Sequence, residues 1–336
     1  MTRRSPSEPE AALPSNAGRR DSGASNIGPS RPPRRRWRRY LSSYAFLAPN
    51  FLGFLVFTLL PVAAAFVLSF TEWDILSRPR FLGLHNFDQL LLFHREGSRL
   101  VPNDPSFWKY LWNTVFLMFG IPLSVLGSLF CALLLNQRLR GVVFFRTLFF
   151  LPAICSAVAV TLLWKWMFQE DYGLLNTWLR DIGIAHPPRW LVTTAWAKPA
   201  FIIMSLWMTI GGYNCILYLA GLQNIPTELY EAADMDGANA WHKLRYVTWP
   251  LLSPTTFFIV TMAIISGFQG GFIAAYMMTG GGPAGATTTI MLYIYQNAFQ
   301  WFQMGYAAAI ACVLFALIFG FTLVNWRLSQ RMVHYQ

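Results

Sequence analysis

The stretch LLSPTTFFIVTMAIISGFQGGFIAAYMM, residues 251–278, contains no Asp, Glu, Lys or Arg. It belongs to a longer run, from Tyr246 to Trp326, that is free of these four residue types throughout. One helix crosses the hydrocarbon core of a bilayer with about 20 apolar residues. The run is therefore long enough for more than one crossing, and it predicts an integral membrane protein.

The composition of the whole chain agrees with this interpretation. Of its 336 residues, 55% are hydrophobic and only 12% are charged, whereas about a quarter of a soluble domain is charged. Six apolar runs are long enough to cross as helices, which predicts an all-α membrane fold in one domain, residues 41–336. The expected spans are 44–70, 111–135, 144–167, 200–222, 251–278 and 306–326, with a polar loop at 223–250 between the fourth and the fifth.

The basic residues are concentrated before the first span. The formal net charge is +11, and ten of the 26 lysines and arginines precede Tyr40. Little apolar content predicts a disordered tail over residues 1–40, and its position beside a span favours contact with anionic lipid over nucleic acid. Six crossings with a basic tail inside predict that both termini are cytoplasmic.

The spans carry no ionisable residue deep within them. Ion-coupled transporters usually hold buried charges along their path, so the sequence disfavours a secondary transporter, which stays the alternative. An uncharged path suits a neutral, hydroxyl-rich solute such as a sugar or oligosaccharide. Candidate path residues, for each of which helix packing is the alternative role, are Tyr213, Asn214, Phe268, Gln269 and Tyr276.

The polar loop has a local pattern of its own, ELYEAADMDGANAWHKLRYVTWPLLSP at residues 228–254. Glu228 suits the positive end of a helix dipole, and Gly237 suits a left-handed helix stop. A second short helix is expected over 240–247, and Pro250 would open the fifth span. The pattern predicts a bent two-helix hook on the cytoplasmic side; a plain connector between two spans is the alternative.

The order Glu231-Ala232-Ala233, Gly237 and then Val247-Thr248-Trp249-Pro250 resembles the EAA signature of ABC importer permeases. Val247 stands where that signature has Ile, and Trp249 stands where it has Leu. Other segments resemble the carbohydrate-type permeases (maltose, lactose and glycerol 3-phosphate) in matching order, and the resemblance covers about Tyr40 to Arg331. These segments are Phe81–Phe87, Phe107–Leu117, Arg146–Phe168, Gly173–Leu179, Thr279–Phe299 and Gly305–Ala311.

The resemblance implies a type I permease fold in a bacterial or archaeal cytoplasmic membrane. It also implies partners: a second, different permease chain, two cytoplasmic ATPase subunits and an external solute-binding protein. The loop would be the coupling helix that docks on the ATPase, through Glu231, Ala232, Ala233, Gly237 and Pro250. Import of glycerol 3-phosphate or another polyol by the same family stays open, although a phosphate would be expected to want Arg or Lys in the path.

The sequence predicts neither an enzyme nor a cofactor or metal site on this chain. A P-loop needs Gly-Lys, and no lysine here follows a glycine, so ATP would be used by partner subunits. The glycine-rich TGGGPAG, residues 279–285, lacks lysine and is expected to be a flexible turn before the last span. The four cysteines lie in apolar runs and suit core packing.

Overall fold

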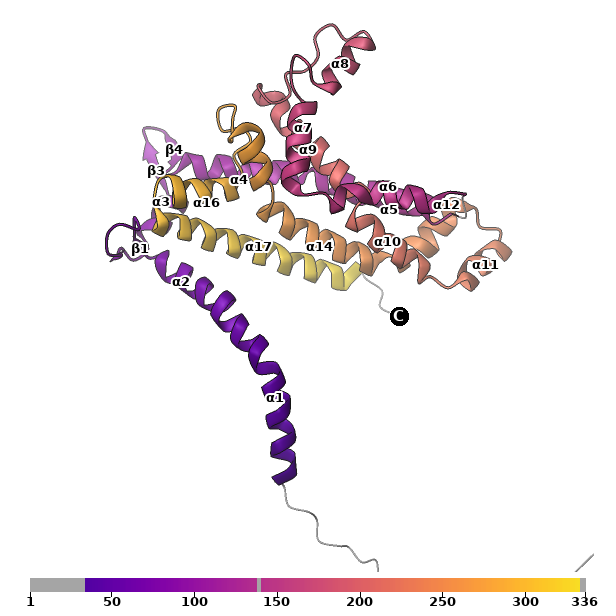
Figure 1. The fold of residues 1–336 in the computed structure, drawn as a ribbon, viewed down its shortest axis with the longest axis horizontal. Helices are drawn as coiled ribbons and strands as arrows, with labels where there is room; N and C mark the ends of the chain where they lie inside the picture. The colour runs from indigo at the N-terminus through magenta and orange to yellow at the C-terminus, as the bar shows by residue number, and fades with distance from the viewer. Residues whose placement is uncertain (1–33, 138–139, 333–336) are drawn as a thin grey trace, which may run out of the picture. The chain divides into compact units, whose positions relative to one another are not determined.

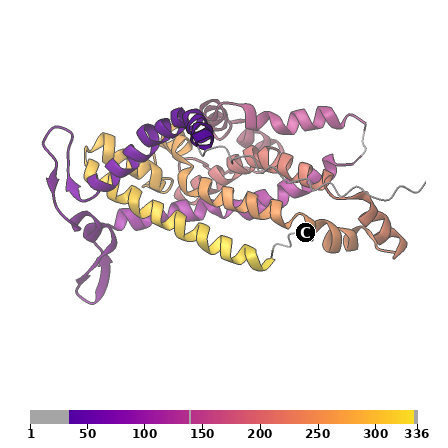
Figure 2. The same cartoon turned by 90° about the horizontal axis from the view of Figure 1, so that it is seen from below.

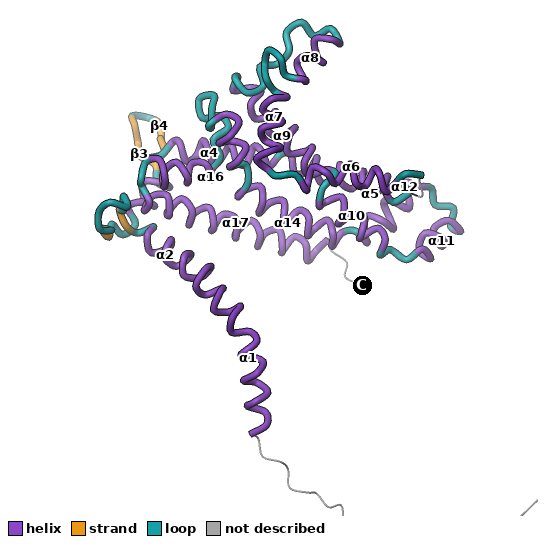
Figure 3. Tube along the Cα trace, viewed as in Figure 1, coloured by secondary structure: helices purple, strands orange, loops and turns teal. Residues whose placement is uncertain are grey.

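The computed structural model describes residues 34–137 and 140–332, and these are mostly helical (Figures 1 and 3). The chain divides into two compact units, Met1–Leu59 and Leu60–Gln336. The described part of the first unit is α1 (Arg34–Phe54), followed by the π-helical turn η1 (Leu55–Leu59). Most of the predicted basic tail, 1–40, lies outside the described residues.

The second unit contains the remaining elements. Its helices are α2 (Leu60–Leu68), α3 (His85–Leu91), α4 (Pro105–Met118), α5 (Gly120–Leu135), α6 (Val142–Ile154), α7 (Ala157–Met167), α8 (Leu174–Asp181), α9 (Thr194–Ile210), α10 (Tyr213–Gln223), α11 (Thr227–Met235), α12 (Ala240–Lys243), η2 (Leu244–Thr248), α13 (Trp249–Leu251), α14 (Ser253–Gln269), α15 (Phe272–Ala274), η3 (Ala275–Thr279), α16 (Ile290–Tyr295), η4 (Gln296–Gln300) and α17 (Met304–Met332). Two antiparallel ribbons, which the sequence did not predict, pair β1 (Thr71–Glu72) with β2 (Arg80–Phe81) and β3 (Phe93–Glu96) with β4 (Arg99–Pro102). Thr71 lies opposite Phe81, and Phe93 lies opposite Pro102.

Five helical stretches in the described residues are long and apolar enough to cross a membrane, and a sixth forms if one bent pair counts as a span. The five are Ser43–Leu68, Pro105–Leu135, Thr194–Gln223, Ser253–Thr279 and Met304–Arg327. The expected third span, 144–167, differs from the prediction of one straight helix, because α6 and α7 meet at 97°. Cys155 adopts an extended backbone there and ends α6.

Two of the π-helical turns have a common cause in the sequence. The turn η1 ends two residues before Pro61, and η2 ends two residues before Pro250. A proline inside a helix lacks its N–H and its ring crowds the carbonyl of the preceding turn. A wider turn accommodates that ring, so the helix that carries Pro250 continues into α14 rather than starting at the proline.

The interior of the second unit has three apolar clusters. One joins α5, α10 and α14 around Tyr218, which is fully buried. The second joins α7, α9, η3 and α16 around Phe201, and the third joins α3, α4, α14, α16 and α17 around Ile310. Small residues allow close helix approach within a membrane; Gly211 lies so near α6 that a Cβ there would be 2.3 Å from the carbonyl oxygen of Phe149.

The second unit has two distinct ends (Figures 1 and 2). The helices α11 and α12 lie at one end, and the two strand ribbons lie at the opposite end, where Figure 3 colours them orange. The first end is called the hook end below, and the other is called the ribbon end.

The glycine-rich segment 279–289 is not the flexible turn that the sequence predicted. Its backbone is bound to α4: the Asn113 side chain donates to the carbonyls of Gly285 (2.8 Å) and Thr288 (3.0 Å), and Lys109 Nζ donates to that of Ala284 (2.6 Å). Within the segment, Thr287 Oγ1 donates to Gly282 O at 2.7 Å. These contacts give four of its backbone carbonyls a side-chain partner, which orders the segment.

Candidate functional site

The polar segment between α10 and α13, residues 227–248, is called the hook. Its first helix, α11, ends at Met235, and Gly237, which follows the C-cap residue Asp236, has a φ of +74°. The Gly237 N–H donates to Asp234 O (3.0 Å), and the Ala238 N–H donates to Ala233 O (2.9 Å). This pair of bonds is the Schellman motif, which favours glycine at the left-handed position. Gly237 therefore stops α11 as the sequence predicted.

The second half of the hook is tied back to the first half. The Asn239 side chain accepts from a backbone N–H of α12 and caps that helix. Lys243 of α12 forms an ion pair with Asp234 of α11, and the hydroxyl groups of Tyr230 and Thr248 are hydrogen-bonded at 2.9 Å. The hook is thus a fixed bend between two spans, held by polar contacts that cross it.

The structure brings four of the five predicted coupling residues together on or beside α11. Glu231, Ala232 and Gly237 are exposed, and Ala233 is half-buried. Pro250 lies apart from them, half-buried in α13 behind the turn η2. The exposed face of α11 can therefore be reached by a partner, whereas Pro250 belongs to the connection with α14.

The hook also exposes large apolar side chains that the sequence reasoning missed. Met235 at the end of α11 is 89% exposed, and Trp241 in α12 is 66% exposed. Exposed apolar groups beside polar ones mark interaction surfaces. The signal in the sequence was the presence of Met and Trp in a segment that is otherwise polar and lies outside the apolar runs.

The five predicted path residues do not form one cluster. Phe268 is 1% exposed and packs against Phe321, so within this chain it has a packing role. Tyr213 is 68% exposed with its ring edge-on to Phe150. Two more lie separately: Asn214 is half-buried with its Nδ2 3.5 Å from Ser124 Oγ, and Gln269 is exposed at the last position of α14.

The fifth predicted residue, Tyr276, belongs to an aromatic group that the sequence reasoning did not identify. Its ring, 44% exposed, is stacked with Phe272 at 5.7 Å and lies edge-on to Tyr295 at 5.6 Å. Phe299 extends the group from Tyr295 at 5.4 Å. Aromatic faces of this kind combine a large apolar surface with phenol hydroxyls, which suits contact with a sugar ring.

An apolar groove of about 340 Å³ lies between α6 and α9. Phe149, Pro152, Trp207 and Ile210 line it, and none of the predicted path residues does. Within the described residues there is also no group of His, Cys, Asp and Glu side chains that could hold a metal ion.

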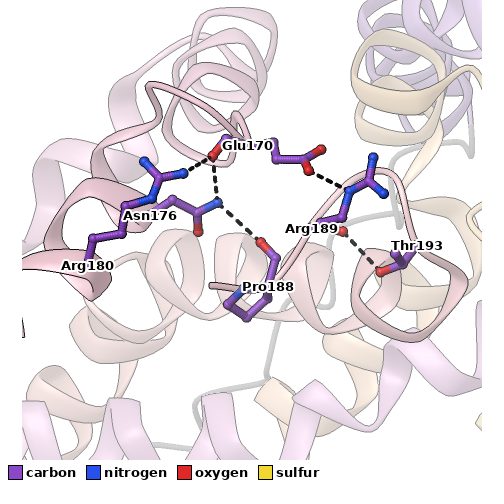
Figure 4. Close-up of polar contacts among 6 residues, drawn as sticks. All are labelled: Glu170, Asn176, Arg180, Pro188, Arg189 and Thr193. Atoms are coloured by element: carbon purple, nitrogen blue, oxygen red, sulfur yellow. Dashed lines mark hydrogen bonds and ion pairs between the residues drawn. The ribbon is translucent and has the colours of Figure 1, made fainter. Parts of the chain in front are cut away.

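Between α7 and α9 the chain forms a small lobe, residues 169–193, that contains α8 (Figure 4). The fully buried Asn176 organises it: its Nδ2 donates to Glu170 O (3.0 Å) and Pro188 O (3.2 Å), and its Oδ1 accepts from Trp190 Nε1 (2.7 Å). The Glu170 carboxylate is paired with Arg189 Nε at 2.5 Å. These bonds connect the two ends of the lobe.

Asp104 forms a buried polar junction at the start of α4. Its Oδ1 accepts from the N–H groups of Ser106 (2.8 Å) and Phe107 (3.1 Å), which caps the helix. Its Oδ2 accepts from the hydroxyls of Tyr293 (2.7 Å) and Tyr306 (2.6 Å). Burial, together with the hydrogen bond to the Asp104 carboxylate, raises the pKa of Tyr293 well above its usual range.

Five or six long apolar helices in the described residues, with a polar hook at one end, define the class as a multi-pass membrane protein. Residues 110–334 match the family of the binding-protein-dependent transport system inner membrane component. The chain belongs to this family.

Individual relatives agree in length as well as in sequence. The arabinooligosaccharides transport system permease protein AraP of Bacillus subtilis is 33% identical over 85% of this chain and 88% of its own length. The lactose transport system permease protein LacF of Rhizobium radiobacter is 37% identical over 84% of this chain and 92% of its own length. A bacterial ABC transporter that imports the acidic polysaccharide alginate contains a chain that superposes with a TM-score of 0.74 over 89% of this chain and 100% of its own, at 24% identity. This last similarity shows the type I permease fold.

Proposed function

We propose that this chain is a permease subunit of an ATP-binding-cassette importer for a sugar or oligosaccharide. It forms half of the translocation path together with a second, different permease chain. The family itself and the substrates named for the two permease relatives support this proposal. The chain hydrolyses no ATP in this scheme; separate ATPase subunits do so, and an external solute-binding protein delivers the sugar.

The observation that carries the proposal is the geometry of the hook. The Schellman turn at Gly237, the Lys243–Asp234 ion pair and the Tyr230–Thr248 hydrogen bond fix the angle between α11 and the helix that leads into α14. A push on the exposed face of α11 is then passed to a candidate span rather than absorbed by a loose loop. Movement of an ATPase can thereby rock the spans.

The orientation follows from the same element. The hook end and both termini are assigned to the cytoplasm, where an ATPase subunit has access, and the ribbon end faces the solute-binding protein. Ten of the 26 lysines and arginines lie in the N-terminal tail, and the positive-inside rule favours the cytoplasm for so basic a segment beside a span. The basic tail, 1–40, is assigned to the same side.

Proteoliposomes that hold the full complex and the solute-binding protein test this function. Uptake of radiolabelled saccharides from a panel of neutral and acidic sugars is expected to need internal ATP, to stop with vanadate and to continue in the presence of a protonophore. Uptake without ATPase subunits that collapses with the protonophore would instead show the rival function, an ion-coupled secondary transporter.

The coupling role of the hook is tested by Gly237→Ala. A non-glycine residue in the left-handed region costs roughly 1–2 kcal/mol, and no atom lies within 4 Å of the added Cβ, so the change acts on the bend alone. Fewer saccharide molecules are expected to enter per ATP hydrolysed. Gly97→Ala is the matched control, since Gly97 has a φ of +63° and an equally open surrounding at the ribbon end. If uptake per ATP hydrolysed falls equally in both variants, the hook has no specific role in coupling.

A further inference from the structure

The helix α8 of the small lobe carries a row of exposed apolar side chains. Leu174, Trp178 and Ile182, the last of which is the C-cap residue, are 53%, 60% and 56% exposed. Residues four apart lie on the same face of a helix, so the three side chains form one row, called the α8 stripe. Scattered apolar residues are common on a protein surface, whereas a contiguous row marks a surface that meets an apolar partner.

The direction of the α8 stripe is fixed, because the other side of the helix is bound to the lobe and to the neighbouring helices. Leu175 and Leu179 pack against the apolar cluster that contains Trp164 of α7 and Phe201 of α9. The buried Asn176 is hydrogen-bonded to both ends of the lobe. A rotation of α8 that buried the stripe would break these contacts, so the stripe faces outwards.

The lobe lies between two stretches that are apolar enough to enter a membrane. It follows α7, which is half of the bent pair, and it ends just before the candidate span Thr194–Gln223. Because α8 packs directly on side chains of α7 and α9, it cannot move far from the point where these helices leave the bilayer. The α8 stripe therefore continues the surface that the chain presents to lipid.

The arginines of the lobe are bound within it and lie off the α8 stripe. The Arg180 guanidinium donates to two backbone carbonyls, one of them that of Glu170, at 2.8 Å each. The Glu170 carboxylate pairs with Arg189 (Figure 4). Basic side chains on a helix surface attract anionic lipid, but these two are already engaged. Contact with a membrane would thus depend on the apolar side chains.

We propose that the α8 stripe inserts into the interfacial layer of the bilayer and anchors the lobe to the membrane surface. Trp178 suits this depth, because tryptophan is enriched where headgroups meet water. Amphipathic helices lie there with the apolar face buried by about 5–10 Å. Asp181, exposed beside the stripe, keeps α8 out of the hydrocarbon core, where a charge is costly. The anchor goes beyond the proposed transport function and requires only that the neighbouring helices enter the bilayer.

Photocrosslinking in the full complex tests the anchor. Benzoylphenylalanine replaces Leu174, Trp178 or Ile182 in turn, and the complex is placed in nanodiscs of phosphatidylcholine. After irradiation, intact-mass spectrometry of the chain detects added phospholipid. Arg180 is the control position, because it is exposed and lies about 200° around the helix from Trp178. Lipid adducts are expected to be several-fold more abundant at the three stripe positions than at position 180.

Fluorescence gives a second measurement that needs no crosslinker. Phosphatidylcholine with brominated acyl chains quenches tryptophans that touch it, and Trp178→Phe is expected to reduce the quenched part of the emission. Trp241→Phe is the matched control, since Trp241 is 66% exposed but lies in the hook, and it should leave the quenched part unchanged.

Three results of these experiments would overturn the anchor. The first is a lipid adduct yield at position 180 equal to that at the stripe, or quenching that Trp178→Phe leaves unchanged. The second is an adduct with the solute-binding protein in place of lipid, which would make the stripe a protein docking surface. The third is lipid adducts that form only when anionic lipid is present, which would assign the contact to the charges of the lobe.

Discussion

Asp104 shows how much a single residue organises in this fold. Its two carboxylate oxygens join the start of α4 to Tyr293 of α16 and Tyr306 of α17, side chains that lie 189 and 202 positions further along the chain. Hydrogen bonds to a charged group each contribute about 1.5–3 kcal/mol. The junction therefore fixes α4, α16 and α17 to one another at the start of α4.

This junction predicts an alkaline sensitivity. Because the folded protein raises the pKa of Tyr293, its phenol stays protonated at a pH where the unfolded chain ionises, above about 10. The stabilisation from this group is complete below that pH and is lost as pH rises towards the folded pKa. The melting temperature is expected to fall more steeply above about pH 10 for the wild type than for Tyr293→Phe.

The same variant can also be measured at neutral pH. Loss of one hydrogen bond to Asp104 should lower the free energy of unfolding by about 1.5–3 kcal/mol. Tyr213→Phe is the control, because Tyr213 is exposed and its ring contact with Phe150 survives the change. If the melting temperature falls equally steeply above about pH 10 in the wild type and in Tyr293→Phe, the pKa of Tyr293 is not raised in the folded protein.

At the scale of the element, the broken helices depend on close contacts rather than on loops. Gly211, at the junction of α9 and α10, lies against the Phe149 backbone of α6. The Cys155 bend, where α6 and α7 meet at 97°, follows at the end of the same helix α6. We interpret Gly211 as the contact that sets the spacing between α6 and α9 and thereby supports the bend.

Gly211→Ala tests this contact. Its Cβ would lie 2.3 Å from Phe149 O and 3.0 Å from Phe149 Cβ, so α6 must shift, and overpacking of this kind costs about 1–3 kcal/mol. Gly320→Ala is the matched control in α17, where no atom lies within 4 Å and alanine should stabilise by about 0.5–1 kcal/mol. Thermal unfolding of the purified complex should therefore shift in opposite directions for the two variants.

The ion pair across the hook is a second element that can be tested. Asp234→Lys places two cations opposite each other, and the charge-swapped double variant Asp234→Lys with Lys243→Asp restores attraction. An exposed pair contributes only about 0–1 kcal/mol to stability, so the melting temperature should barely change. Amide exchange in residues 227–248 should accelerate in the single variant and return to normal in the double variant.

If amide exchange in residues 227–248 stays fast in the double variant, the ion pair is not what orders the hook. If exchange returns to normal while uptake stays low, the two side chains contact the ATPase directly. Uptake per ATP hydrolysed, measured alongside exchange, separates these two roles.

At the scale of the molecule, the sequence predicted what depends on local pattern. Runs of apolar residues identified the spans, and the left-handed stop at Gly237 was predicted correctly from the helix-forming block before it. The α6–α7 bend was not predictable, since apolar composition continues unchanged across Cys155. The Asp104 junction was also not predictable, because it joins helices that are distant in sequence.

The central claim is that the exposed face of α11 is where an ATPase subunit acts on this chain. Its most direct test replaces Ala232 with a photoreactive benzoylphenylalanine in the full complex. The same replacement at Ala195, an exposed alanine in the first turn of α9, is the control. Irradiation followed by mass spectrometry is expected to give an adduct with the ATPase subunit from position 232 and none from position 195. No ATPase adduct at position 232, or equal adducts at both positions, would contradict the account.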